Sequence, residues 1–117
     1  MAESCSCGIS IEKPDKTVSP EEFAKEIKSS DYYLLDVRKP DEYESGHIEG
    51  AANLDVTDPN FSEEAKSNLP KDKIIAVYCG TGKRSGMAAT KLIEEGFKIL
   101  NLDGGLNAWK AAGLPVT

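Results

Sequence analysis

The feature that most constrains the fold is one apolar run and the loop that it enters. Ile74-Ile75-Ala76-Val77-Tyr78 leads directly into Cys79 and a glycine-containing loop. A short continuous apolar run is typical of a strand buried on both faces, as in a parallel sheet. A helix pattern follows this loop and ends at Gly96. We expect the inner side of that helix to carry Met87, Ala88, Leu92 and Ile93.

The rest of the chain repeats this alternation of strands and helices. Apolar runs at 32–37, 51–54 and 97–102 predict strands, whereas residues 38–50 are polar and suggest no regular element. Helix starts are indicated by Ser19-Pro20, where Ser19 can act as a cap, and by Ser62, and a last short helix carries a core Trp109. The sequence therefore predicts an α/β fold, with a central, largely parallel sheet and helices on both faces.

Length and composition predict one domain and limit its partners. The chain has 117 residues, of which we interpret 1–15 as a mobile tail and 16–117 as the domain. Fourteen basic and twenty acidic residues give a net charge of −6, which argues against nucleic acid or an anionic membrane as a general partner. Three cysteines are an odd number, and two of them are Cys5 and Cys7, so no disulfide framework is expected. Without a signal-like start or a membrane-spanning run, we expect a cytoplasmic protein.

Cys79 lies where three effects favour a reactive thiolate. The following helix presents unpaired N–H groups and a partial positive charge at its N-terminus. Gly80 and Gly82 allow a backbone that turns successive N–H groups inward, which makes an anion-binding nest. Lys83 and Arg84 add two cations in an otherwise acidic chain. Together these features predict a nucleophilic cysteine and an anionic substrate.

A structural interpretation of the same residues stays open. Cys79 could be a small buried side chain at the end of a strand, since free cysteine is among the most buried residue types. The two glycines could serve an ordinary turn, and Lys83 and Arg84 could lie on a solvated helix face.

Three motifs in this order resemble the rhodanese family, specifically its single-domain sulfurtransferases, over about residues 17–116. The first is Leu35-Asp36-Val37-Arg38, which continues through Glu42-Tyr43 to Gly46-His47-Ile48-Glu49-Gly50-Ala51-Ala52-Asn53. The second is the loop from Cys79 to Ser85, and the third is Leu102-Asp103-Gly104-Gly105 with Trp109, Gly113 and Pro115.

This resemblance implies that Cys79 takes a sulfane sulfur from a donor such as thiosulfate or a persulfide. Cys79 would hold the sulfur as a persulfide and pass it to cyanide, a thiol or an acceptor protein. The loop residues that would cradle the sulfur or steer the donor are Gly80, Thr81, Gly82, Lys83, Arg84 and Ser85. The resemblance implies no metal and no organic cofactor. Structural support would come from Asp36, Arg38, Glu42 and His47.

Two other functions remain as alternatives. One is a sulfur carrier or binding module of the same fold with little turnover of small donors. The other is a cysteine phosphatase or arsenate reductase. Cysteine phosphatases, some of which share the rhodanese fold, place five residues between the cysteine and the arginine. Here Arg84 is the fifth residue after Cys79, so the loop is one residue short, and Tyr78 stands where those phosphatases have histidine.

The remaining polar candidates favour structural interpretations. His47 is the only histidine, and we place it in a structural turn. Asp36, Arg38 and Glu42 are expected to form a hydrogen-bonded network below the loop. Cys5 and Cys7 provide at most two metal ligands, whereas a closed zinc site needs four. A solvated tail is our first interpretation of them, and sulfur or disulfide exchange with Cys79 is the alternative.

Overall fold

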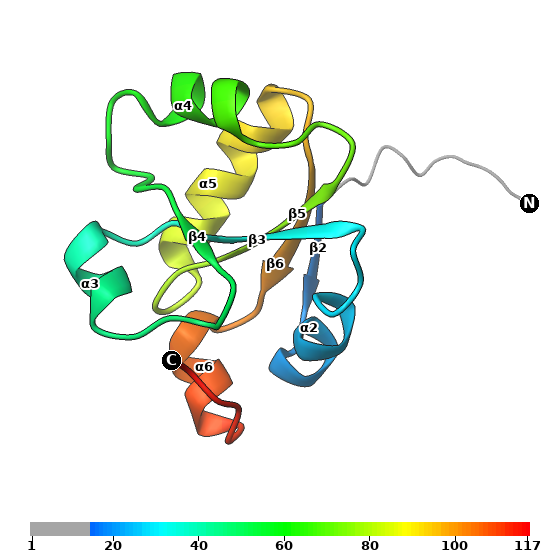
Figure 1. Cartoon of the computed structure of the whole chain (residues 1–117), viewed down its shortest axis with the longest axis vertical. Coiled ribbons are helices and arrows are strands. Elements are labelled where there is room, and N and C mark those ends of the chain that lie inside the picture. Colours follow the sequence, from blue (N-terminus) through cyan, green and yellow to red (C-terminus); the bar gives the residue numbers. More distant parts are fainter. Residues whose placement is uncertain (1–14) are drawn as a thin grey trace, which may run out of the picture.

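The computed structural model describes residues 15–117, which form one layer of parallel strands between two layers of helices (Figure 1). The sheet has five strands in the order β2-β6-β5-β3-β4, and every neighbouring pair is parallel. The strands are β2 (Asp15–Val18), β3 (Tyr32–Asp36), β4 (Ala52–Asn53), β5 (Ile74–Tyr78) and β6 (Lys98–Leu102). The helices are α2 (Pro20–Glu26), α3 (Pro40–Glu44), α4 (Phe61–Asn68), α5 (Lys83–Glu94) and α6 (Gly105–Ala111).

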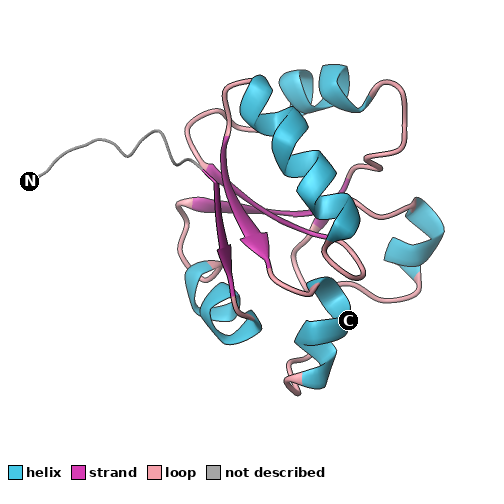
Figure 2. Ribbon diagram, turned by 180° about the vertical axis from the view of Figure 1, so that it is seen from behind, coloured by secondary structure: helices cyan, strands magenta, loops and turns pink. Residues whose placement is uncertain are grey.

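Helices cover both faces of the sheet, as the sequence predicts (Figures 1 and 2). α4 and α5 pack on one face through Phe61, Ala65, Ala88 and Leu92. α2 and α6 pack on the other through Phe23, Leu106 and Trp109. The predicted α/β fold with a parallel central sheet is therefore confirmed, and Trp109 lies in the core as expected.

Side chains alternate between the two cores along β5. Ile75 and Val77 face α5, whereas Ala76 and Tyr78 face α2 and α6. This period of two continues one residue past the strand, so Cys79 joins the core on the α5 side. The same alternation that buries the strand thus decides on which side of the sheet the thiol lies.

Two elements were missed by the sequence analysis. β2 carries one buried apolar side chain, Val18, because it is an edge strand whose Lys16 and Thr17 are exposed. α3 occupies part of the polar segment 38–50, and it begins with Pro40 at its first position and with Glu42 accepting a hydrogen bond from the Lys39 N–H at 3.1 Å. Neither element has the apolar pattern on which the prediction relied.

One expected core residue is exposed. The Met87 side chain is 47% exposed. Ala89 is buried on α5 instead of Met87. The prediction that Met87 lies on the inner side of the helix is therefore wrong. The predicted tail lies outside the described residues except for Asp15, with which β2 begins. Within residues 15–117, none of the helices has the length and apolar character needed to span a bilayer.

Candidate active site

Cys79 lies immediately after the central strand, at the edge of the sheet where the carboxyl ends of the strands meet (Figure 1). The neighbouring strand β3 ends in register with it, because Asp36 pairs with Tyr78 and the Val37 N–H donates to the Tyr78 carbonyl at 3.0 Å. Ligand sites in open parallel sheets form at this edge. The position predicted for the site from the sequence is thus the position that the topology favours.

The loop after Cys79 turns a backbone N–H toward the sulfur. The Gly82 N–H donates to Cys79 Sγ with a separation of 2.9 Å. Gly82 has a φ of +103° and is the N-cap of α5, a left-handed conformation that side chains other than glycine rarely adopt. Lys83, Arg84 and Ser85 begin the helix, so their N–H groups lack intrahelical acceptors. The Ser85 hydroxyl donates to the Gly82 carbonyl at 3.2 Å and helps to fix this turn.

A second glycine turn, Gly104-Gly105, packs against the backbone of Cys79 and Gly80. The N–H groups of Leu106 and Asn107, at the start of α6, donate to the carbonyls of Cys79 and Gly80 at 2.7 and 3.0 Å. A Cβ at Gly105 would lie 2.5 Å from the Cys79 carbonyl oxygen, so only glycine allows this approach. The sequence analysis quoted Asp103-Gly104-Gly105 as a motif without giving it a role. The paired glycines were the signal, but their contact with residues 79 and 80 is long-range.

A half-exposed ion pair, which we call the rim pair, stands beside the loop. Arg84 Nη1 lies 2.7 Å from Glu42 Oε1, and Arg84 Nη2 lies 3.1 Å from Oε2. The side chains of Arg84 and Glu42 are 29% and 38% exposed. The hydrogen bonds from Arg84 are the main reason that the pKa of Glu42 is lowered to about 2, with a further contribution from the Lys39 N–H. The carboxylate also raises the pKa of Arg84.

A second ion pair, which we call the buried pair, lies under the site. Arg38 Nη2 is 2.7 Å from Asp36 Oδ2, and Arg38 Nε contacts both carboxylate oxygens at 3.0 Å. Arg38 Nη2 also donates to the Gly46 carbonyl at 2.6 Å, and Asn53 Nδ2 donates to the Arg38 carbonyl at 2.9 Å. Burial opposes the charge on Arg38, but the hydrogen bonds and charge of Asp36 prevail and raise the pKa of Arg38.

Tyr78 connects this network to the segment after α3. Its hydroxyl accepts a hydrogen bond from the Ile48 N–H at 3.0 Å. Burial, followed by the nearby charge of Asp36, raises the pKa of Tyr78. The sequence analysis treated Tyr78 as the end of a strand and as a departure from the phosphatase pattern. Nothing local in the sequence signals a contact that spans thirty residues.

The remaining predicted site residues are Thr81, Lys83 and His47, together with Cys5 and Cys7 of the predicted tail. Thr81 and Lys83 are exposed, and within residues 15–117 no ion pair involves Lys83. The His47 ring stacks on Tyr43 with a centroid distance of 3.9 Å, and Nδ1 lies 2.8 Å from the Tyr43 carbonyl oxygen. His47 also exchanges backbone hydrogen bonds with Thr117. Cys5 and Cys7 lie outside the described residues.

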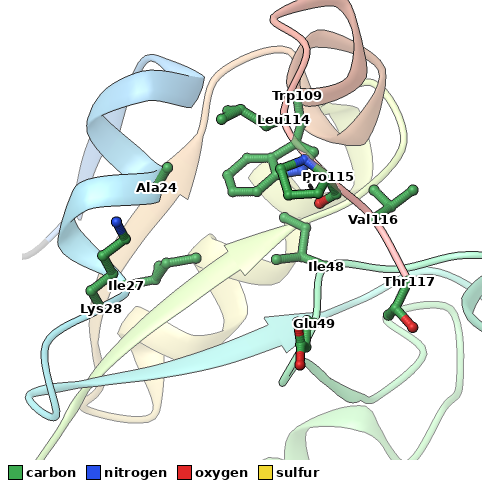
Figure 3. Close-up of a pocket in the computed structure, with 10 residues that line it drawn as sticks. All are labelled: Ala24, Ile27, Lys28, Ile48, Glu49, Trp109, Leu114, Pro115, Val116 and Thr117. Carbon is green, nitrogen blue, oxygen red and sulfur yellow. Dashed lines mark hydrogen bonds between the residues drawn. The ribbon is translucent and has the colours of Figure 1, made fainter.

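A cavity on the α2 and α6 face is separate from the Cys79 site. It has a volume of about 480 Å³, and Figure 3 shows Ile27, Ile48, Trp109 and Leu114 among the side chains around it. Cys79 faces the opposite side of the sheet, in the core beneath α5. In the part of the chain that the structure describes, no three His, Cys, Asp or Glu side chains are grouped as metal ligands would be.

Comparison with known proteins identifies the family. Residues 19–112 match the family model of the rhodanese-like domain. The chain belongs to the rhodanese-like domain family. A sulfurtransferase from Allochromatium vinosum is 36% identical over 89 residues, which are 75% of this chain and 80% of that protein. The uncharacterized protein YqhL from Bacillus subtilis is 38% identical over 95 residues, which are 80% of this chain and 71% of YqhL.

Solved structures agree with this assignment. The crystal structure of a rhodanese-related protein from Thermoplasma volcanium matches with a TM-score of 0.73 and 30% identity, covering 87% of this chain and 97% of that one. The resemblance inferred from the three motifs is therefore confirmed. Membership in the rhodanese family, with a sulfurtransferase among the relatives, supports sulfur-transfer activity in general.

Proposed function

We propose that this protein is a cytoplasmic sulfurtransferase that uses Cys79 to carry sulfur from a donor such as thiosulfate to a thiol, a protein or cyanide. The observation that carries the proposal is the position of Cys79 Sγ. The sulfur lies after the central strand, accepts the Gly82 N–H at 2.9 Å and precedes the N-terminus of α5. Backbone N–H groups at a helix start suit a sulfur that carries negative charge, and the thiolate is the nucleophilic form of cysteine.

The reaction divides into two displacements. In the first, the Cys79 thiolate attacks the outer sulfur of thiosulfate. The bond between the two donor sulfurs breaks, its electron pair leaves with sulfite, and the enzyme retains a persulfide. In the second, an acceptor thiolate or cyanide attacks the outer sulfur of that persulfide and restores the Cys79 thiolate. Charge and electrons balance in both steps, and no oxidant or reductant is consumed.

The loop residues have separate roles in this scheme. Amides from Gly80 to Ser85 hold the negative outer sulfur of the persulfide, since the first N–H groups of α5 have no intrahelical acceptor. The exposed Lys83 steers an anionic donor toward the loop. Cys79 itself is buried, whereas the loop residues that follow it, Gly80 to Lys83, are half-buried or exposed. We therefore expect the donor to approach from the side of this loop.

Phosphate chemistry is a poorer fit to the same loop. Arg84 follows Cys79 by five positions, one fewer than in the cysteine phosphatases, and its guanidinium is engaged by Glu42. The other alternative is a sulfur-carrier module that forms the persulfide but turns over small donors slowly.

Thiocyanate formation from thiosulfate and cyanide tests the proposal. We expect turnover by the wild type and by Cys5→Ser/Cys7→Ser, and none by Cys79→Ser. Under the same conditions para-nitrophenyl phosphate and arsenate should not react. A carrier module would form the persulfide on Cys79 but release thiocyanate only slowly over repeated turnovers. Hydrolysis of the phosphate ester, or activity that survives in Cys79→Ser, would contradict the proposed function.

A further inference from the structure

The rim pair suggests how the site distinguishes sulfur donors by their charge. We propose that Glu42 is a specificity-determining residue, which neutralises Arg84 beside the Cys79 loop and so favours donors with less negative charge over dianionic ones. This inference rests on the proposed function of Cys79 and adds a preference among its donors.

The geometry places the charge of Glu42 at the loop. The Arg84 guanidinium passes so close to Gly80 that a Cβ there would lie 3.6 Å from Nη2. Both Arg84 Nη atoms are held by the two oxygens of Glu42, at 2.7 and 3.1 Å. A cation that could meet the sulfonate of a donor is thus already paired with a carboxylate. A donor that reaches the loop meets a neutral pair rather than a free guanidinium.

Glu42 is itself fixed in this position. Its Oε1 accepts the Lys39 N–H at 3.1 Å, which ties the carboxylate to the first turn of α3. The hydrogen bonds from Arg84 and Lys39 also keep the pKa of Glu42 at about 2, so the carboxylate stays ionised at neutral pH. Arg84 can therefore contact a donor with full charge only if the donor displaces an anchored carboxylate.

The remaining free cation at the loop is Lys83, at least among residues 15–117. It is exposed, and the attraction that an exposed charge exerts is screened by salt within about 10 Å at 0.1 M. The site thus attracts a donor weakly, and an extra negative charge on the donor adds little to this attraction. A donor with one negative charge, such as an organic thiosulfonate, loses less than thiosulfate does from the pairing of Arg84.

Two donors that differ by one charge provide the test. Thiosulfate is a dianion, and its leaving group is sulfite. Methanethiosulfonate is a monoanion, and its leaving group is methanesulfinate. In both, the Cys79 thiolate attacks the terminal sulfur and the leaving group takes the electron pair of the broken sulfur–sulfur bond. The measured quantity is the ratio of kcat/KM for thiosulfate to kcat/KM for methanethiosulfonate.

Glu42→Gln and Arg84→Met should move this ratio in opposite directions. Glu42→Gln unpairs the guanidinium, and we expect the ratio to rise about fivefold at low salt. Arg84→Met leaves the carboxylate unpaired, and we expect the ratio to fall about fivefold. Both changes should shrink as salt is added. The matched control is Glu44→Gln, which removes one negative charge from an exposed position on the same helix and should leave the ratio unchanged.

The outcomes separate this inference from the proposed function. If the pair only shapes the loop, both variants lower kcat/KM for both donors equally and the ratio does not change, which overturns the inference. A ratio that Glu44→Gln raises as much as Glu42→Gln does would also overturn it, because the effect would then come from net charge. If neither donor reacts with the wild type, the proposed function itself fails.

Discussion

The buried pair and the rim pair have the same chemistry in different surroundings. In the buried pair, the side chains of Arg38 and Asp36 are 8% and 0% exposed. In the rim pair, the side chains of Arg84 and Glu42 are 29% and 38% exposed. Both are arginine–carboxylate pairs with a shortest N–O distance of 2.7 Å. The shortest contact is therefore equally close in the two pairs, and we expect the difference in solvent exposure to decide what each pair does.

Burial makes one pair a part of the fold and leaves the other adjustable. Removing one partner of a buried pair leaves an uncompensated charge out of water, which costs several kcal/mol. Removing one partner of an exposed pair leaves a charge that water solvates, which costs little. We therefore expect the buried pair to stabilise the fold, and the rim pair to set the charge at the loop without unfolding the domain.

The largest expected effect is on stability when the buried pair is broken. Arg38→Met leaves Asp36 charged and buried, and we expect a loss of about 3–5 kcal/mol in the free energy of unfolding. Arg84→Met, the matched change in the rim pair, should cost no more than about 1 kcal/mol. Urea denaturation of the two variants and the wild type measures both values. Equal losses would show that exposure does not separate the two pairs.

The turn at Gly105, like the buried pair, is a feature whose disruption we expect to destabilise the fold. Gly105→Ala places a Cβ 2.5 Å from the Cys79 carbonyl oxygen and 2.7 Å from the Gly80 carbonyl, so the backbone must shift. We expect a loss of about 2–3 kcal/mol in unfolding free energy and impaired sulfur transfer.

Gly86→Ala is the control for this substitution, because a Cβ there meets open space within α5. It should stabilise the protein by about 0.5–1 kcal/mol, as alanine usually does in a helix. Thermal denaturation and a sulfur-transfer assay of both variants distinguish steric contact from a general effect of adding a methyl group. Two variants with the same melting temperature would contradict the proposed support.

The smallest expected effect is the pH dependence of the rim pair. The pKa of Glu42 is lowered from 4.5 to about 2, chiefly by Arg84. A lowered carboxyl pKa stabilises the folded state fully above pH 4.5, and this stabilisation is lost as the pH falls toward 2. Solvent screens the half-exposed pair, so we expect less than about 1 kcal/mol.

Urea denaturation of the wild type and of Glu42→Gln isolates this contribution. The advantage of the wild type at neutral pH should diminish as the pH approaches the folded pKa of about 2. An advantage that grows in acid would mean that the sign of the linkage is wrong.

Local sequence patterns predicted the central strands and α5, but they did not predict the peripheral elements β2 and α3. β3, β5 and β6 were identified because buried strands are continuous apolar runs. α5 was identified from a helix pattern that ends at Gly96. β2 was missed because it is mostly exposed, and α3 because its apolar content is low. Met87 was misplaced because it fits the helical period but lies outside the buried stripe.

The candidate site divides in the same way. Cys79 and its loop were predicted because the nucleophile, glycines and helix start are consecutive in the sequence. The pairing of Arg84 with Glu42 could not be predicted, because the two residues are 42 positions apart and meet only when α3 packs beside the loop. The sequence analysis counted Arg84 as a free cation for the donor, and the structure gives it a carboxylate partner.

The mass of the protein after a single exposure to thiosulfate tests the central claim most directly. We predict a gain of one sulfur atom, located on the peptide that contains Cys79 and removed by cyanide. The gain should persist in Cys5→Ser/Cys7→Ser and be absent from Cys79→Ser. No gain in the wild type, or a gain located on a peptide without Cys79, would contradict the assignment of Cys79 as the residue that carries the sulfur.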